Sequence, residues 1–178
     1  TEHYTDALFH LWADDVATLY VMPREHFPLS DLVEPPQSLN VTDQAPWLIL
    51  DDFFPTLLTG FRVAEYNAHL DAFPQLSVLS SVGDFADQHT EYAQRYPEHT
   101  NRVRPYAPGW LAGAGLAYIN FLNNAHQFLP ALQQHQLPFV LTLYPGGGFG
   151  LNEAESDIKL QAVLASPLLQ AIIVTQPV

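Results

Sequence analysis

Short apolar runs and amphipathic stretches alternate along the chain from Trp47 onward, and this alternation predicts strands and helices in turn. An apolar run of strand length is typical of a buried strand, whereas apolar positions three and four apart are typical of a helix. The predicted strands cover residues 47–50, 76–79, 116–121, 139–144 and 171–175. The predicted helices cover residues 61–72, 83–97, 123–136 and a stretch from 152 to the break at Pro167.

The run Phe139–Tyr144 is apolar except for one threonine, as in strands that are covered on both faces. Together with the alternation, it predicts an α/β fold with a doubly wound, mainly parallel, Rossmann-like sheet. Ligands of such sheets bind beyond the carboxyl ends of the strands. We therefore expect the loops 51–60, 120–124 and 144–151 to converge on one concave surface.

Three local features refine this picture. The helix 61–72 has one face of helical spacing that predicts close packing on the sheet, made by Phe61, Ala64, Ala68 and Ala72. Asn152 and Glu155 have the spacing of a capping box, which predicts a helix start at Asn152. Residues 101–109 are interpreted as a loop.

The first 45 residues are the least regular part of the sequence. Residues 17–22 are compatible with a strand, and the prolines at 23, 28, 35 and 36 indicate loops after it. We therefore expect residues 1–45 to be an irregular extension packed on a Rossmann-like domain of residues 46–178. The chain starts at Thr1 and stops at Val178, directly after a predicted strand, so we expect it to be a piece of a longer protein.

Composition narrows the classes of partner. Of the 178 residues, 48% are hydrophobic, and the formal net charge is −13. Binding to nucleic acid requires clustered Lys and Arg, which this chain lacks, so we expect no nucleic-acid partner. No apolar run reaches the roughly 20 residues that span a bilayer. The absence of cysteine and of a signal peptide favours a cytoplasmic protein and allows a peripheral position at the membrane.

The run Pro145–Gly150 contains three consecutive glycines between a predicted strand and a predicted helix. The backbone amides of Gly146, Gly147 and Gly148 can approach a phosphate or a sugar hydroxyl closely because no side chain intervenes. The run matches neither a Walker loop nor G-x-G-x-x-G. A tight strand-to-helix turn is the alternative interpretation.

Polar side chains follow the first predicted strand. Asp51 and Asp52 are candidates for a general base or for orienting hydroxyls, with solvated surface as the alternative. Arg62, just after Thr59 and Gly60, is a candidate for contacting an anionic group, with a salt bridge as the alternative.

Aromatic and amide side chains complete the candidate set. Phe54 and Phe149 lie on predicted loops and offer flat faces for stacking on sugar rings, as do Phe53, Tyr144 and Trp110, although aromatic residues also fill cores. Asn120, Asn123 and Asn124 follow the third strand and can both donate and accept hydrogen bonds. The scattered histidines have no ligand spacing, so no metal site is predicted, and no G-x-S-x-G motif supports a serine hydrolase.

Five segments resemble bacterial group 1 glycosyltransferases of the GT-B, GT4-like type. Residues 49–68, starting Ile-Leu-Asp-Asp-Phe-Phe-Pro, are similar to the first strand, acceptor loop and first helix of the amino-terminal domain. Residues 137–149, ending Tyr-Pro-Gly-Gly-Gly-Phe, are similar to its fourth strand and following loop. Residues 155–160, 166–168 and 173–176 resemble its next helix and strand. The resemblance covers roughly residues 46–178.

The resemblance implies the amino-terminal, acceptor-binding half of a GT-B fold, with a carboxyl-terminal donor domain outside this chain as its partner. It implies transfer of a sugar from a nucleotide-sugar donor to a glycan or lipid-linked acceptor, with no cofactor in this domain and no turnover by this domain alone. Many relatives have a histidine where this sequence has Tyr144, and the paired-glutamate donor signature is absent from these 178 residues. The alternatives are a single-domain Rossmann-like epimerase or hydrolase and a non-catalytic carbohydrate-binding module.

Overall fold

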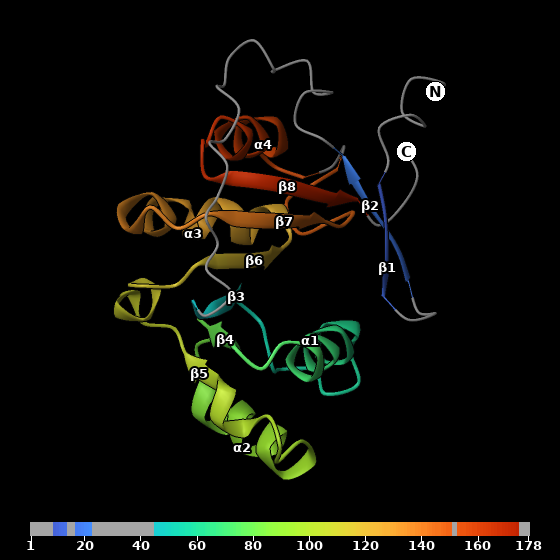
Figure 1. Ribbon diagram of the computed structural model, residues 1–178, viewed down its shortest axis with the longest axis vertical. Helices are drawn as coiled ribbons and strands as arrows, with labels where there is room; N and C mark the ends of the chain where they lie inside the picture. The colour runs from blue at the N-terminus through green and yellow to red at the C-terminus, as the bar shows by residue number, and fades with distance from the viewer. Residues whose placement is uncertain (1–8, 14–16, 23–44, 151–152, 175–178) are drawn as a thin grey trace. The chain divides into compact units, whose positions relative to one another are not determined.

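A computed structural model describes residues 9–13, 17–22, 45–150 and 153–174. These residues form an α/β, mainly parallel, Rossmann-like fold, which confirms the predicted fold class (Figure 1). The chain divides into two compact units, of which unit 1 comprises Thr1–Asn40 and Ile119–Val178 and unit 2 comprises Val41–Tyr118. The boundary falls within the strand β6 (Leu116–Asn120), so the range predicted as one domain is shared by both units.

Unit 2 is built from parallel strands and the helices between them. Its elements are β3 (Trp47–Asp51), α1 (Phe61–Ala72), β4 (Leu76–Ser80), α2 (Phe85–Arg95), the 3-10 turn Thr100–Arg102, β5 (Val103–Pro105) and the 3-10 turn Pro108–Leu111. The strand β4 pairs in parallel with β3 on one side and with β5 on the other. The predicted strands 47–50 and 76–79 and the predicted helices 61–72 and 83–97 are thus confirmed to within two residues.

The buried face of α1 differs from the prediction. The helix buries Val63, Tyr66, Asn67 and Leu70, whose spacing is also helical. The face predicted to pack on the sheet, with Phe61 and three alanines, is exposed instead. Both patterns fit a helix, but Val, Tyr and Leu remove far more apolar surface from water than alanines do, and burial stabilises roughly in proportion to that area.

One apolar cluster forms the core of unit 2. Its buried side chains come from the strands β3, β4 and β5, the helices α1 and α2 and the loop after β3: Ile49, Phe54, Val63, Tyr66, Leu70, Leu76, Val78, Tyr92 and Val103. The helix α2 contributes only Tyr92, whose hydroxyl donates to Asn67 Oδ1 (2.6 Å). Val103 belongs to β5, which lies in the stretch 101–109 that was predicted to be loop, so that prediction is wrong there. A three-residue strand is too short for an alternating pattern to develop.

Unit 1 contains the remaining strands. Its elements are β1 (Phe9–Ala13), β2 (Ala17–Met22), the end of β6, α3 (Leu122–His135), β7 (Phe139–Leu143), α4 (Ser156–Leu164) and β8 (Leu169–Val174). β7 and β8 are parallel, whereas β2 is antiparallel to both β8 and β1. The strand predicted at 17–22 is confirmed, and its pairing with β8 joins part of the N-terminal stretch to unit 1. The strand β1 was not predicted.

The start of α4 also differs from the prediction. The helix begins at Ser156, and Glu155 precedes it with φ of 58° and makes no side-chain capping bond. The capping role predicted for Glu155 is therefore wrong, and Asn152 lies outside the described residues. The chain first turns after the glycine run, where the Glu153 amide donates to the Gly150 carbonyl (3.1 Å), and this turn delays the helix.

Candidate functional site

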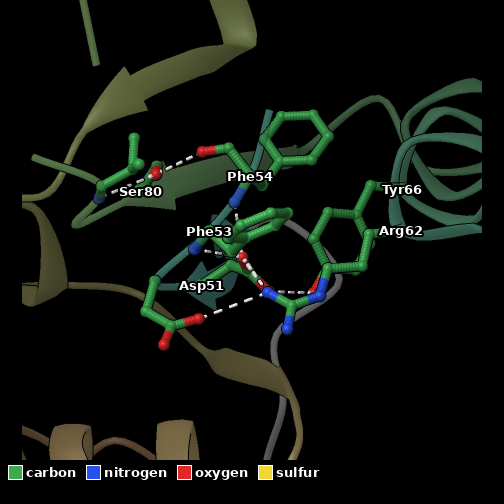
Figure 2. A network of polar contacts seen from close by, with 8 residues as sticks. Asp51, Phe53, Phe54, Arg62, Tyr66 and Ser80 are labelled. Carbon is green, nitrogen blue, oxygen red and sulfur yellow. Dashed lines mark hydrogen bonds and ion pairs between the residues drawn. The ribbon is translucent and has the colours of Figure 1, made fainter. Parts of the chain in front are cut away.

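The buried carboxylate of Asp51 organises the loop that follows β3. Its Oδ1 accepts hydrogen bonds from the amides of Phe53 (2.8 Å) and Phe54 (2.7 Å) and from Arg62 NH1 (2.8 Å). Its Oδ2 accepts a hydrogen bond from the Tyr66 hydroxyl (2.7 Å). Figure 2 shows these donors converging on the one carboxylate. We call Asp51, Arg62 and Tyr66 the Asp51 clamp.

Local sequence rules explain how the clamp forms. An aspartate side chain readily bonds backbone amides two or three residues further on, and this turns the chain directly after the strand. Arg62 and Tyr66 are four residues apart on α1, so their side chains lie on the same face of the helix. The clamp therefore ties the start of the loop to the helix at its end.

Electrostatics favour the cationic form of Arg62 and the neutral form of Tyr66 beside Asp51. Burial would lower the pKa of Arg62, but the nearby carboxylates, Asp51 foremost, outweigh burial and raise it above its ordinary value. Burial, together with the charge and hydrogen bond of Asp51, raises the pKa of Tyr66 well above its ordinary value. Arg62 thus stays protonated as a cation and Tyr66 stays a neutral donor. Asp51 is surrounded by donors that fix the loop, so we regard it as a positioning residue.

Asp52 differs from Asp51 in that solvent reaches it. Its side chain is 42% exposed, and its Oδ1 accepts a hydrogen bond from Arg62 NH1 (3.2 Å). Of the two candidate carboxylates, Asp52 is therefore the one available to a ligand. Thr59 is exposed, and Gly60 precedes α1 at the N-cap position.

The two phenylalanines of the loop have opposite surroundings. Phe54 is 1% exposed and its ring contacts Tyr66 and Tyr92, with centroids 5.2 Å away in both cases. Its carbonyl accepts a hydrogen bond from Ser80 Oγ, which ties the loop to the end of β4 (Figure 2). The stacking role predicted for Phe54 does not fit this burial. Phe53, 44% exposed, is the loop aromatic that solvent reaches.

The glycine run after β7, in unit 1, forms a tight hairpin. Gly146 and Phe149 exchange backbone hydrogen bonds in both directions (2.8 and 3.1 Å), and Gly147 and Gly148 between them have φ of 55° and 97°. Positive φ at both central residues is the pattern of a type I′ turn, which glycine adopts without steric cost. The alternative interpretation of the glycine run as a tight turn is thus correct for its backbone. Whether its amides also bind a ligand is not tested by this geometry.

The hairpin also packs closely on the start of α3. The Gly147 carbonyl accepts a hydrogen bond from the Asn123 amide (2.9 Å), which satisfies a donor at the helix N-terminus. A Cβ atom on Gly147 would lie 2.3 Å from the Phe121 ring, and one on Gly148 would lie 2.3 Å from Asn123 Oδ1. Both glycines are therefore required by the packing as well as by the turn.

Polar and aromatic residues surround this hairpin. Asn123 Oδ1 accepts a hydrogen bond from the side chain of Lys159 (3.0 Å), while Asn120 and Asn124 are buried. The rings of Phe121 and Tyr144 lie 5.2 Å apart between centroids. Phe121 has φ of 73° and ψ of 144°, a conformation that costs a residue with a side chain on the order of 1–3 kcal/mol.

Each predicted loop can now be located in a unit. The loop 51–60 belongs to unit 2, whereas residues 120–124 and the glycine hairpin belong to unit 1. The structure brings Asn123 together with Gly147 and Gly148, and it brings Asp51 together with Arg62 and the backbone of Phe54. Convergence of all three loops on one surface stays a prediction.

Sequence reasoning missed three contributors: Tyr66, Ser80 and Lys159. The i, i+4 spacing of Arg62 and Tyr66 was a usable signal, because it places both side chains beside the same aspartate. Ser80 carried a weaker signal, as a polar residue at the end of an apolar strand. Nothing in the local pattern marked Lys159 as a partner of Asn123, which precedes it by 36 residues.

Comparisons with protein-family models, with curated proteins and with solved structures find no match to this chain. Within the described ranges, no helix is long and apolar enough to cross a membrane. The same residues contain no group of three or more His, Asp or Glu side chains that could hold a metal ion.

Proposed function

We propose that this chain is the acceptor-binding part of a glycosyltransferase. In this proposal the enzyme moves a sugar from a nucleotide-sugar donor to a hydroxyl group of a glycan or lipid-linked acceptor, at a cytoplasmic or membrane-peripheral location. A further, carboxyl-terminal domain would bind the donor. The Rossmann-like fold is compatible with the proposal, and the sequence resemblance to the acceptor half of GT-B enzymes motivates it.

The observation that carries the proposal is the Asp51 clamp. A loop that only reverses the chain direction needs no buried ion pair, and burying charges is costly unless their partners are well placed. A binding loop benefits from such fixation, because ligand-contacting groups must be held in position before the ligand arrives. The clamp holds a loop at the carboxyl end of β3, where Rossmann-like sheets bind ligands.

The proposed chemistry divides between two domains. Sugar transfer requires the acceptor oxygen to be held close to the anomeric carbon, which is a matter of positioning. Asp52, the exposed carboxylate of the loop, is suited to accept a hydrogen bond from an acceptor hydroxyl. The leaving nucleoside diphosphate needs positive charge, which the proposed donor domain would supply.

Two measurements test the proposal. The longest natural protein that contains this sequence should release a nucleoside diphosphate from a nucleotide sugar in an acceptor-dependent way. By calorimetry, residues 1–178 alone should bind nucleotide sugars weakly or not at all. A low-micromolar dissociation constant, about −8 kcal/mol, would contradict the assignment to the acceptor side. Turnover by residues 1–178 alone would favour a complete single-domain enzyme.

A further inference from the structure

The loop 51–60 and the first residue of α1 expose three large apolar side chains that are close together in sequence. Phe53, Leu57 and Phe61 are 44%, 56% and 54% exposed. Single exposed hydrophobic residues are common, but several on one loop are more often part of a binding surface. The loop is ordered although these side chains are exposed, because hydrogen bonds to Asp51 fix its backbone on both sides of Phe53.

Arg62 supports Phe53 from one side. Its guanidinium carbon lies 5.2 Å from the centroid of the Phe53 ring, a distance at which a cation is attracted to the ring face. The same guanidinium is bonded to Asp51 and Asp52, so it cannot move away without breaking the clamp. The ring of Phe53 is therefore held in place and still reaches solvent.

The neighbouring carboxylate restricts what can bind here. In the described part of the chain no residue donates a hydrogen bond to Asp52 Oδ2. A lipid chain or an apolar protein surface covering this site would strip water from a carboxylate without replacing its hydrogen bonds, which is costly. A phosphate group is also disfavoured, because the two carboxylates beside Arg62 outnumber its single positive charge and the chain has a net charge of −13.

We propose that Phe53 and Asp52 form a subsite for one neutral pyranose ring of the acceptor. The apolar C–H face of the sugar stacks on the Phe53 ring, whose negative face attracts these hydrogens. Hydroxyl groups at the edge of the sugar donate to Asp52 Oδ2. The inference rests on the proposed function and adds to it the chemical class of the group bound at this loop.

A second aromatic pair in unit 2 supplies a control. Arg104 lies over the ring of Trp110, 4.5 Å from its centroid, and Trp110 is 47% exposed. Within the described residues, the one hydrogen bond of Arg104 runs from its Nε to the Asn101 carbonyl (3.2 Å), and no carboxylate pairs with it. Trp110 was also a candidate for stacking on sugars, but its ring lacks the neighbouring carboxylate that the subsite requires. Trp110→Leu therefore tests whether any exposed, arginine-stacked ring is enough.

The experiment is saturation-transfer NMR on residues 1–178 with methyl glycosides of glucose, galactose, mannose, N-acetylglucosamine and rhamnose as probes. Irradiating aromatic protons should transfer saturation to the C–H protons on one face of at least one glycoside. Phe53→Leu and Asp52→Asn should each weaken binding of that glycoside by about fivefold or more, corresponding to about 1 kcal/mol. Trp110→Leu should leave it unchanged. Thermal melting should confirm that all three variants fold.

Three results would overturn the subsite: no glycoside bound by the natural sequence, binding that survives both substitutions, or a dimer abolished by Phe53→Leu in sedimentation experiments. The proposed function is judged separately, by sugar transfer in the longer protein. If transfer occurs and Phe53→Leu leaves the KM for the acceptor unchanged, the subsite fails and the function stands. If glycosides bind as expected and no transfer occurs, the subsite stands and the function fails.

Discussion

The two loops at the strand ends are held by opposite means. The loop 51–60 depends on side chains, because a buried carboxylate gathers two amides, a guanidinium and a phenol. The glycine hairpin depends on the absence of side chains, because two residues with positive φ pack directly on Phe121 and Asn123. The first loop should therefore be sensitive to the loss of polar groups, and the second to the gain of a methyl group.

Replacing Arg62 should produce the largest loss of stability. Arg62→Met removes the cation that faces Asp51 and leaves a buried carboxylate without its ion-pair partner, which typically costs about 3–5 kcal/mol. The free energy of unfolding in urea measures the effect. Arg104→Met, which removes a more weakly anchored arginine, is the control and should change stability by no more than about 0.5 kcal/mol. Equal losses in the two variants would show that the clamp does not stabilise unit 2.

Adding a methyl group to the glycine hairpin should lower the free energy of unfolding somewhat less than Arg62→Met does. Gly148→Ala introduces a Cβ atom 2.3 Å from Asn123 Oδ1 at a φ of 97°. Strain from overpacking costs about 1–3 kcal/mol, and a side chain at positive φ adds about 1 kcal/mol.

Two matched substitutions separate these causes. Gly146→Ala has positive φ, but its Cβ would meet only Glu153 Oε1 at 4.0 Å, so this variant should lose only the conformational part. Gly83→Ala has neither problem. If Gly146→Ala and Gly148→Ala are equally unstable in urea, close packing on α3 contributes nothing. Gly147→Val would lower stability as well as the proposed sugar transfer, because its Cβ would meet the Phe121 ring. This variant therefore cannot show whether the hairpin binds a ligand.

Removing one hydroxyl from the clamp should have a smaller effect than removing its cation. Tyr66→Phe removes the hydroxyl that donates to the buried Asp51 Oδ2, and hydrogen bonds to charged groups contribute about 1.5–3 kcal/mol. Tyr118→Phe removes a hydroxyl that donates to the partly exposed Glu65, where water can replace it. Urea unfolding should therefore show a clearly smaller loss for Tyr118→Phe. The reverse order would mean that Oδ2 is not the buried acceptor described above.

The sequence predicted where strands end but not which side chains face inward. The polar residues after β3 and the glycine run after β7 were located correctly, because apolar strands stop where polar or glycine-rich segments start. Orientation within the loop depended on the Asp51 turn, which buries Phe54 and exposes Phe53. Two adjacent, chemically identical side chains carry no sequence signal that distinguishes them.

Packing between elements was equally hard to predict. The glycine run was predicted from composition, but its fit against Phe121 depends on distances between segments that are far apart in sequence. The helix α1 offered two apolar faces of the same period, and only the volume of the core selects the one with Val63, Tyr66 and Leu70. Helical spacing of apolar residues cannot decide which face of α1 is buried when both faces have that spacing.

The smallest expected effect is a pH dependence of stability that arises from His69 in unit 2. His69 lies on α1, and its ring meets that of Tyr118 edge to face, with centroids 5.0 Å apart. Burial lowers the pKa of His69 below its ordinary value, despite the opposing charge of Glu65. The folded protein therefore favours neutral His69, whereas the unfolded chain takes up a proton near the ordinary pKa of about 6.5.

The sign of the effect follows from proton uptake. Between the two pKa values the unfolded chain binds more protons than the folded one, so the free energy of unfolding rises with pH in this window. Above about pH 6.5 the stabilisation is complete, and it is lost as the pH falls toward the folded pKa. Urea midpoints of residues 1–178 at pH 7.5, 6.5 and 5.5 should show the loss, and His69→Gln should reduce it. His126→Gln, on an exposed position of α3 in unit 1, is the control and should keep the full pH dependence. If His69→Gln keeps the full pH dependence too, burial of His69 does not contribute to it.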